Sequence, residues 1–384
     1  MKKVLIGIIL CLGIILIGGC SSDPIKHEKA SKEIMFEDVG ICEELKGNIK
    51  EIIPLNSSYR ILLSNVETIT TDLPRTETSY LVLTNNGKLY TLIDSEKPKY
   101  TNGTTCQVIE HDIEIDKLFL MSDSALVITK DNQIYNINIY TSGNQYTTNV
   151  TNRFGNVSDI KNIIVDGDGL IYVLKNNGSM YYLALNDSNK QQYSVTIDSN
   201  VKSNIDNLIS SVNNKYAFYP INKDKVIIGS KNARDSFVQK YNDYKFTNIE
   251  SSYSENAKSS IEYAIDIDNN IYAKLVNDNN SNEYSLIINS DKINGNVQQF
   301  FGNLLITSSS IYIIDTKEKE FLDEETTYIL NDLSTKFTNI NELANGKIET
   351  MTYTTTSKNE YQISGVMLKD NKIVRYYSNI IQGD

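Results

Sequence analysis

The sequence contains no tryptophan and only two histidines, which limits the catalytic chemistry open to it. The two histidines, His27 and His111, lie far apart in the chain. A serine hydrolase triad and a histidine-rich zinc site both need more imidazole groups than this inventory supplies. No glycine-rich nucleotide-binding motif and no GxSxG nucleophile motif is present. We therefore predict no enzymatic activity, no catalytic residues, no metal ligands and no cofactor.

Positive charge is also scarce, because 37 lysines and arginines face 48 aspartates and glutamates, for a net charge of −11. Proteins that bind nucleic acid need basic surface to neutralise phosphates, so nucleic acid is not an expected partner. An acidic surface is likewise repelled by anionic lipid. Contact with a membrane would therefore depend on a covalent lipid.

The N-terminus carries the features of an export signal. Lys2 and Lys3 precede an apolar stretch over residues 4–17, which at 14 residues is short of the roughly 20 that cross a bilayer as a helix. Gly18 and Gly19 then precede Cys20, in a pattern that resembles the bacterial lipobox. We predict a signal peptide over residues 1–19 and a lipidated Cys20 at the mature N-terminus; the alternative is an ordinary secretory signal with an incidental cysteine.

Cysteine is rare in the rest of the chain. Cys11 lies in the predicted signal and Cys20 takes the lipid, which leaves Cys42 and Cys106. Two thiols in an oxidising compartment can pair, but nothing in the sequence specifies the geometry that a disulfide needs. A Cys42–Cys106 disulfide and two free buried thiols both stay open.

The composition and hydrophobic pattern of the sequence change at about residue 48. Residues 20–47 are charged and lack alternation, so we expect a tether and lead-in, with a short helix possible over 31–45. Residues 48–384 consist of short apolar or alternating runs rich in Ile, Val, Tyr and Thr, separated by Asn, Asp, Gly and Ser pairs. Such a composition is typical of all-β domains.

Two linked patterns recur seven times in this part of the chain. One is a hairpin signature, in which a tight turn joins an apolar strand to a second strand, at 82–92, 126–137, 163–174, 216–230, 263–275, 304–314 and 365–377. The other is a tetrad, two polar residues bracketed by apolar ones, which precedes each hairpin at 66–69, 115–118, 157–160, 205–208, 246–249, 297–300 and 337–340.

A period of 40 to 51 residues between the tetrads is that of propeller blades. A sheet of about four short strands cannot bury both of its faces alone, whereas neighbours stacked around a ring can do so. We predict an all-β, seven-bladed β-propeller. Because closure removes exposed sheet edges, we expect residues 49–55 and 59–65 to pair with strands near the C-terminus.

The repeats resemble those of the regulator of chromosome condensation family, a family of seven-bladed propellers. The resemblance rests on residues 86–90 (Asn-Gly-Lys-Leu-Tyr) and 168–172 (Asp-Gly-Leu-Ile-Tyr), with a trace of the family's tail over 229–232. The family's tryptophan is absent, and the glycine before the strand is mostly missing. The resemblance implies the fold and assigns no nucleotide-exchange or chromatin role.

Two kinds of candidate ligand contact remain. Tyrosines in irregular loops could stack on sugars, and the sequence offers Tyr100, Tyr146, Tyr193 and Tyr253. Alternating oxygens at 166–168 and 266–270 are compatible with calcium, but both segments lie where the repeat needs a tight turn, and no EF-hand glutamate follows. We therefore interpret the two acidic segments as turns.

These patterns predict a lipid-anchored protein on the extracytoplasmic face of the cell membrane, whose propeller binds a protein or glycan partner at one face of the ring. The alternatives are an enzyme that uses carboxylates to cleave cell-wall or exogenous polysaccharide, and a structural subunit of an envelope complex. The carboxylates are too numerous for composition to exclude the enzyme.

Overall fold

The first strands of the chain belong to a ring of small antiparallel sheets. A computed structural model describes residues 33–38, 45–54, 78–94, 105–109, 113–120, 124–142, 145–166, 170–184, 191–211, 217–233, 236–241, 243–254, 256–276, 283–317, 326–355 and 361–378. All of them lie in one unit, Lys32–Asp384. None of the helices in these ranges is both long and apolar enough to cross a membrane.

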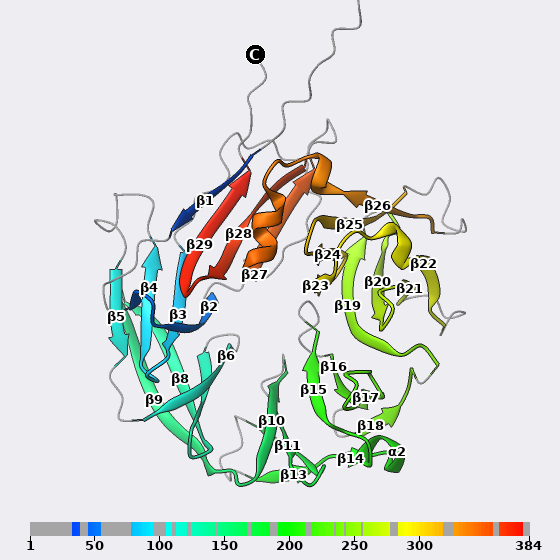
Figure 1. Cartoon of the computed structure of the whole chain (residues 1–384). Coiled ribbons are helices and arrows are strands. Elements are labelled where there is room, and N and C mark those ends of the chain that lie inside the picture. Colours follow the sequence, from blue (N-terminus) through cyan, green and yellow to red (C-terminus); the bar gives the residue numbers. More distant parts are fainter. Residues whose placement is uncertain are drawn as a thin grey trace, which may run out of the picture. The chain divides into compact units, whose positions relative to one another are not determined.

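The described residues form seven blades around a centre, which confirms the predicted all-β propeller (Figure 1). Blades 1 to 3 each contain four consecutive antiparallel strands, with the innermost strand first. Blade 1 holds β2 (Ile49–Pro54), β3 (Thr78–Thr84), β4 (Leu89–Asp94) and β5 (Thr105–Ile109). Blade 2 holds β6 (Ile115–Leu120), β7 (Ser124–Thr129), β8 (Gln133–Ser142) and β9 (Gln145–Asn156). Blade 3 holds β10 (Ile160–Val165), β11 (Leu170–Lys175), β12 (Met180–Ala184) and β13 (Gln192–Ser194).

Blades 5 and 6 have the same order, and blade 7 borrows its outermost strand. Blade 5 holds β19 (Phe246–Ser254), β20 (Ser259–Asp266), β21 (Ile271–Leu275) and β22 (Ser285–Ile288). Blade 6 holds β23 (Val297–Phe301), β24 (Leu304–Thr307), β25 (Ile311–Thr316) and β26 (Tyr328–Asp332). Blade 7 holds β27 (Lys347–Thr355), β28 (Tyr361–Lys369), β29 (Lys372–Ser378) and, from the other end of the chain, β1 (Ile34–Asp38).

Blade 4 is divided into two sheets, β15 (Asn207–Ser210) with β16 (Phe218–Ile221), and β17 (Gly229–Ala233) with β18 (Ser236–Gln239) and β14 (Thr196–Ile197). Pro220 has no N–H to give to the neighbouring strand, so the ladder between β16 and β17 is interrupted. Strand β14 pairs with β18 in parallel, which ties the chain leaving blade 3 to the outer part of blade 4. The short helix α2 (Ser199–Lys202) follows β14.

The core is built between blades. The buried apolar side chains form seven clusters, one at each interface between neighbouring blades. The centre of β11, for example, is buried on both faces, with Ile171 and Val173 packed toward blade 2 and Tyr172 and Leu174 toward blade 4. Because each such side chain contributes about 1.5–3 kcal/mol when fully buried, a single blade is unstable without its neighbours.

Closure of the ring differs from our expectation. Residues 49–54 form β2, which pairs with β3 and not with the C-terminus, so that prediction is wrong; residues 59–65 lie outside the described residues. The closing strand is β1, which pairs with β29 along its whole length, from Ile34 opposite Ser378 to Asp38 opposite Val374. These residues lie in the segment that we assigned to the tether, where a short helix was expected.

The side chain of Asn339 holds the start of the closing strand. Its Oδ1 accepts the backbone N–H of Ile34 at 2.8 Å, and its Nδ2 donates to the carbonyl oxygen of Ile34 at 2.7 Å. The remainder of β1 is joined to β29 by side chains as well: Glu37 contacts Tyr377 and Arg375, and Asp38 pairs with Lys372 at 2.9 Å.

Each of the seven hairpins that we predicted joins two consecutive strands of one blade, although one occupies a different place in its blade. In six blades the hairpin joins the second strand to the third, whereas residues 163–174 join the first strand of blade 3 to the second. The equivalent turn of blade 3 is residues 176–179. Three predicted tetrads do not lie on inner strands as expected. The tetrad at 157–160 is replaced by 160–163, and the tetrad at 337–340 lies among the 3-10 turns η4 (Leu333–Thr335) and η5 (Ile340–Asn345). The tetrad at 66–69 lies outside the described residues.

Replacing Asn339 with alanine tests the closure. The variant Asn339→Ala leaves the N–H and C=O of Ile34 without their side-chain partner, and we expect the free energy of unfolding to fall by about 1–2 kcal/mol in urea denaturation. Asn345→Ala, at the exposed end of η5, is the control and should change it by less than about 0.5 kcal/mol. Equal effects of the two variants would contradict a specific role of Asn339.

Candidate functional site

Each of the seven inner strands begins with a bulge. In six of them the ladder to the second strand shifts register at the second residue of an apolar-polar-polar-apolar tetrad, as between Ile49 and Glu51 in blade 1. In blade 4 the backbone N–H of Asp206 donates to the carbonyl of Ile221, and Asn207 is paired with the same residue, so two residues of the inner strand face one residue of its neighbour. The seven tetrads begin at residues 49, 115, 160, 205, 246, 297 and 348.

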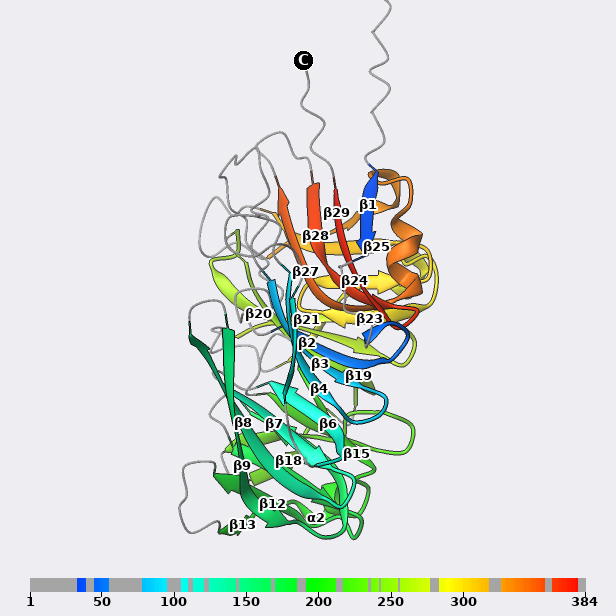
Figure 2. The same cartoon turned by 90° about the vertical axis from the view of Figure 1, so that its left-hand side faces the viewer.

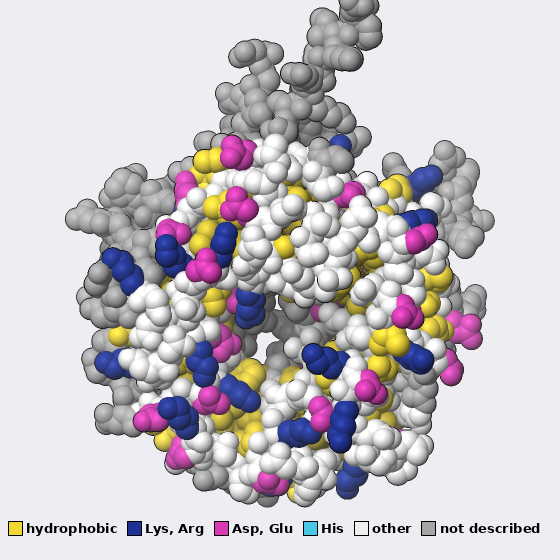
Figure 3. Space-filling view, viewed as in Figure 1, with side chains coloured by type: hydrophobic (Ala, Val, Ile, Leu, Met, Phe, Trp, Pro, Cys, Tyr) yellow, Lys and Arg dark blue, Asp and Glu magenta, His cyan; other side chains and the backbone are white. Residues whose placement is uncertain are grey.

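A bulge places two successive side chains on the same side of a strand, so the bulges gather thirteen described polar side chains at one end of the ring; the side chain of Thr350 lies outside the described residues. We call this end, where the inner strands begin, the first face. The second tetrad positions are Lys50, Asp116, Lys161, Asp206, Thr247, Gln298 and Glu349, and the third positions are Glu51, Lys117, Asn162, Asn207, Asn248, Gln299 and Thr350. Figure 3 shows an opening at the centre of the ring with lysine or arginine side chains around it.

Third-position side chains bond to the inner strand of the next blade. Asn162 donates to Asn207 Oδ1 at 2.6 Å and to the Leu208 carbonyl at 3.0 Å. Asn248 donates to the Phe300 carbonyl at 3.3 Å, and Glu51 accepts a hydrogen bond from the backbone of Leu118. Each bond joins blade n to blade n+1, so these side chains both line the first face and hold its wall in place.

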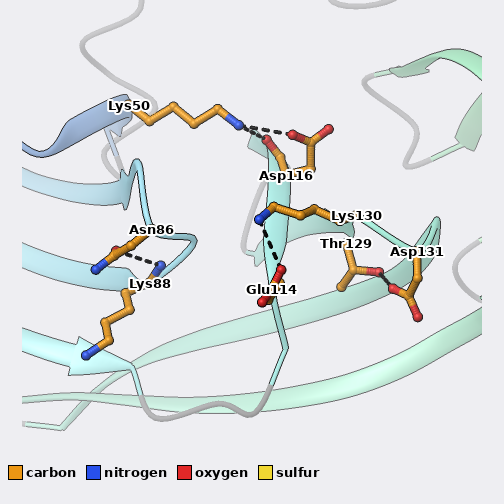
Figure 4. A network of polar contacts seen from close by, with 8 residues as sticks. All are labelled: Lys50, Asn86, Lys88, Glu114, Asp116, Thr129, Lys130 and Asp131. Carbon is orange, nitrogen blue, oxygen red and sulfur yellow. Dashed lines mark hydrogen bonds and ion pairs between the residues drawn. The ribbon is translucent and has the colours of Figure 1, made fainter.

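Charged side chains at the second tetrad positions also pair from one blade to the next. Lys50 Nζ lies 3.1 Å from Asp116 Oδ1 and 2.7 Å from the Asp116 carbonyl (Figure 4), and Lys161 Nζ lies 3.1 Å from Asp206 Oδ1. The side chains of Lys50 and Asp116 are 40% and 43% exposed, so solvent screens the pair and its contribution is at most about 1 kcal/mol. Lys117, between the two pairs along the ring, is exposed.

The junction of blades 7 and 1 holds the acidic part of the first face. Glu349 Oε1 lies 2.8 Å from Lys347 Nζ, and Glu51 is on the neighbouring inner strand. Burial raises the pKa of both Glu51 and Glu349 above the ordinary glutamate value of 4.5; Lys347 opposes this shift for both, and Glu349 adds to it for Glu51. The two carboxyls therefore hold a proton more readily than an exposed glutamate does.

Turns beside the tetrads are stabilised by the last side chain of the preceding strand. Thr84 Oγ1 accepts the N–H of Lys88 at 3.0 Å, and Thr129 Oγ1 accepts the N–H of Gln133 at 2.9 Å. Asp266 does the same in blade 5, where Oδ1 accepts the N–H groups of Asp268 and Asn270 at 2.9 and 2.8 Å. Figure 4 shows Asn86 and Lys88 of the first turn, Thr129 and Asp131 of the second, and Lys130, which pairs with Glu114 at 3.0 Å.

In the acidic segments considered for calcium, Asp266 and Asp166 have such structural roles, whereas Asp168 lies outside the described residues. Asp266 Oδ2 also accepts from Asn270 Nδ2 at 3.0 Å and from Tyr272 Oη at 3.3 Å. Asp166 Oδ1 accepts the N–H of Leu170 at 2.9 Å, and its Oδ2 lies 3.3 Å from Lys231 Nζ. Among the described residues, no group of three or more His, Cys, Asp or Glu is placed to hold a metal ion.

The two candidate tyrosines whose side chains are described lie in different blades. Tyr193 is in β13, at the outer edge of blade 3, and is 36% exposed, whereas Tyr253 is near the end of β19 and is 56% exposed. Tyr100 and the side chain of Tyr146 lie outside the described residues, as do Cys20, Cys42 and the side chain of Cys106. The charged first-face positions were missed as a group: the predicted tetrad at 115–118 contains Asp116 and Lys117, but those at 66–69, 157–160 and 337–340 do not contain Lys50, Glu51, Lys161 or Glu349.

The fold and its polar first face define the class of protein, a seven-bladed β-propeller. No protein-family pattern and no protein sequence of assigned function matches the chain. Among solved structures the chain is similar to "YCF48 bound to D1 peptide", with a TM-score of 0.47 and 9% identity, covering 93% of this chain and 98% of that one. At this distance the similarity says nothing about the partner of this chain.

The buried carboxyls at the junction of blades 7 and 1 predict a pH dependence of stability. The folded ring binds their protons more tightly than the unfolded chain does, so their contribution to the free energy of unfolding is full below pH 4.5 and is lost as the pH rises through the raised pKa values. We expect the double variant Glu51→Gln/Glu349→Gln to lose less stability than the wild type between acidic and neutral pH.

Urea unfolding at a series of pH values measures this slope. The control is Glu114→Gln, which removes a carboxylate whose side chain is 73% exposed and should leave the slope close to that of the wild type. An unchanged slope in the double variant would show that the two carboxyls titrate alike in the folded and unfolded chains.

Proposed function

We propose that the chain is a lipid-anchored extracytoplasmic lipoprotein whose propeller binds a protein or glycan partner at the first face. The observation that carries this proposal is the ring of thirteen described polar side chains at the tetrad positions, gathered on inner strands by seven bulges. Hydrogen bonds between blades hold several of them before any partner arrives, which lowers the entropic cost of binding. The resemblance of the repeats to the regulator of chromosome condensation family adds support for this scaffold and no role.

The anchor part of the proposal rests on the N-terminal sequence. An apolar run of 14 residues ends in Gly-Gly-Cys, and a diacylglycerol on Cys20 would supply two acyl chains, enough for stable membrane residence. With the signal removed, the net charge falls from −11 to −13, so the lipid and not a basic surface would provide attachment.

A second candidate function is carboxylate catalysis at the junction of blades 7 and 1. A glycosidase needs one carboxyl that is protonated near neutral pH and a second that is ionised. Glu51 and Glu349 lie on neighbouring inner strands and both have raised pKa values, which favours this alternative over any other acidic pair described above. Loss of polysaccharide turnover in Glu51→Gln or Glu349→Gln would support the enzyme, and binding without turnover in the wild type would support the binding module.

The anchor is tested by Cys20→Ala. We expect the wild-type protein to fractionate with membranes and to gain the mass of its lipid, and the variant to lose both properties in fractionation and intact mass measurements. Cys11→Ala, in the apolar part of the signal, is the matched control and should behave as the wild type does. A variant at Cys20 that stays in the membrane fraction with unchanged mass would exclude lipidation there.

The first face is tested by a photo-reactive amino acid at one of two lysine positions. Lys117 is exposed on the first face, and Lys258 is exposed in the turn between β19 and β20, at the opposite end of the inner strands. We expect cross-linking in intact cells to give an adduct of defined mass from position 117 and none from position 258. Adducts from position 258 alone, or from neither position, would contradict partner binding at the first face.

A further inference from the structure

Blade 2 has an outermost strand that is much longer than those of the other blades. Strand β9 has 12 residues, whereas the outermost described strands of the other blades, β5, β13, β14, β22, β26 and β1, have between two and five. Natural sheets protect a free edge by keeping its strand short, by placing charged residues or proline in it, or by covering it. Six blades of this ring follow the first of these rules, and blade 2 does not.

The edge strand β9 is also poor in charge. Strands β8 and β9 together contain one charged residue, Arg153, and no proline, although 22% of the whole chain is charged. Residues 145–152 pair with residues 135–142 of β8 in consecutive pairs without a bulge, and the register shift lies beyond them (Figure 2 shows β8 and β9 side by side). The outer side of residues 145–152 is therefore a regular row of backbone N–H and C=O groups, and no described strand pairs with it.

Part of this pair of strands has no third strand beside it. Strand β7 pairs with β8 only from Ile134 to Asn138, so residues 139–142 of β8 pair with residues 145–148 alone among the described strands. A two-stranded sheet is only marginally stable in water, whereas a sheet of three or more strands can be stable. A strand added to the outer side of β9 would supply the missing neighbour.

A second copy of β9 is the strand that fits this edge. Among the described strands of nine or more residues, only β9 is outermost in its blade. A two-fold axis pairs two such strands antiparallel, so that each hydrogen bond made by one copy is also made by the other. The net charge of −11 makes two copies repel each other, whereas residues 145–152 carry no charge. Arg153 lies beyond this stretch, so the two arginines fall at opposite ends of the ladder.

We propose that the outer edge of β9 is a homodimer interface, at which residues 145–152 pair antiparallel with the same residues of a second copy. The two-stranded part of each blade 2 then becomes half of a four-stranded sheet, in which the two β9 strands lie between the two β8 strands. The interface lies on the outermost strand of blade 2 and not on the inner strands of the ring, and so goes beyond the partner binding proposed above.

The test uses sedimentation equilibrium of the full-length protein in detergent micelles, in a buffer that matches the density of the detergent. We expect the wild type to form a reversible dimer at micromolar concentrations. The variant Thr148→Glu/Asn149→Glu places acidic groups at the middle of residues 145–152, where those of the two copies face each other, and should weaken dimerisation by at least about tenfold. Because a free edge tolerates charge, circular dichroism should show that the variant still folds.

Two further variants separate strand pairing from misfolding. Mixing the acidic variant with Thr148→Lys/Asn149→Lys should restore a dimer, because opposite charges then face each other. Ser285→Glu/Leu286→Glu is the matched control, since both residues are exposed neighbours in β22, the outermost strand of blade 5, and it should leave dimerisation unchanged.

A wild type that stays monomeric would overturn the dimer and leave the edge to a strand of a different protein. An equal loss of dimer in the control, or no recovery on mixing, would also overturn it. Cross-linking at position 117 is independent of these measurements, so either proposal can fail alone.

Discussion

The pairing of β1 with β29 is the constraint on which the rest of the ring depends. Every blade buries its apolar faces only against its two neighbours, so an open ring would expose the outer face of the first and the last blade at once. Strand β1, the first of the described strands, completes the sheet of blade 7 on its outer side. The seven interfaces between blades are therefore stabilised together, and the local strength of any one of them matters less than the closure.

Closure also explains why the first face can carry so many polar groups. The inner strands are held from outside, by the apolar clusters between blades, and their first residues are free to bulge. Each bulge turns two polar side chains to the same side, and bonds such as Asn162 to Leu208 then link one inner strand to the next. The same residues thus serve the scaffold and define the chemistry of the opening, with lysines at blades 1 to 3 and the carboxyls of Glu51 and Glu349 at blades 7 and 1.

Much of this fold could be predicted from the sequence, because tight turns and alternating strands are local signals. Asn86-Gly87 and Asp370-Asn371 both mark real hairpins, and repetition made weak signals sufficient. Signals that depend on distant partners were lost. Nothing local distinguishes Ile34–Asp38 from a charged lead-in, since its strand character comes from β29. The tetrad at 337–340 matches the pattern by chance, and the third hairpin was displaced because the sequence has an Asp168-Gly169 turn signal before β11 as well as one after it, at residues 176–179.

The candidate site was predicted less well, for a related reason. Exposed tyrosines can be counted in a sequence, but whether a ring is stacked, as Tyr193 is on Tyr182, depends on strand register. Similarly, the polar members of the tetrads have no distinctive spacing, and their convergence on one opening exists only once seven strands lie side by side. Asp266 illustrates the reverse case, in which a motif compatible with a ligand proved to satisfy its own backbone.

The two hydrogen bonds between the Asn339 side chain and the backbone of Ile34 have a mechanical consequence. Ile34 is the first residue of β1 and forms the first pair of the ladder with Ser378 of β29, so any tension transmitted along the preceding chain reaches the ring at this pair. Peeling of a strand normally starts by separating its terminal pair, one bond at a time. Here Ile34 is also bonded to Asn339, in the segment between blades 6 and 7. A force applied from the N-terminal side is therefore shared by two parts of the ring. The pairing of β1 with β29 then resists separation at the end of the strand where such a force acts.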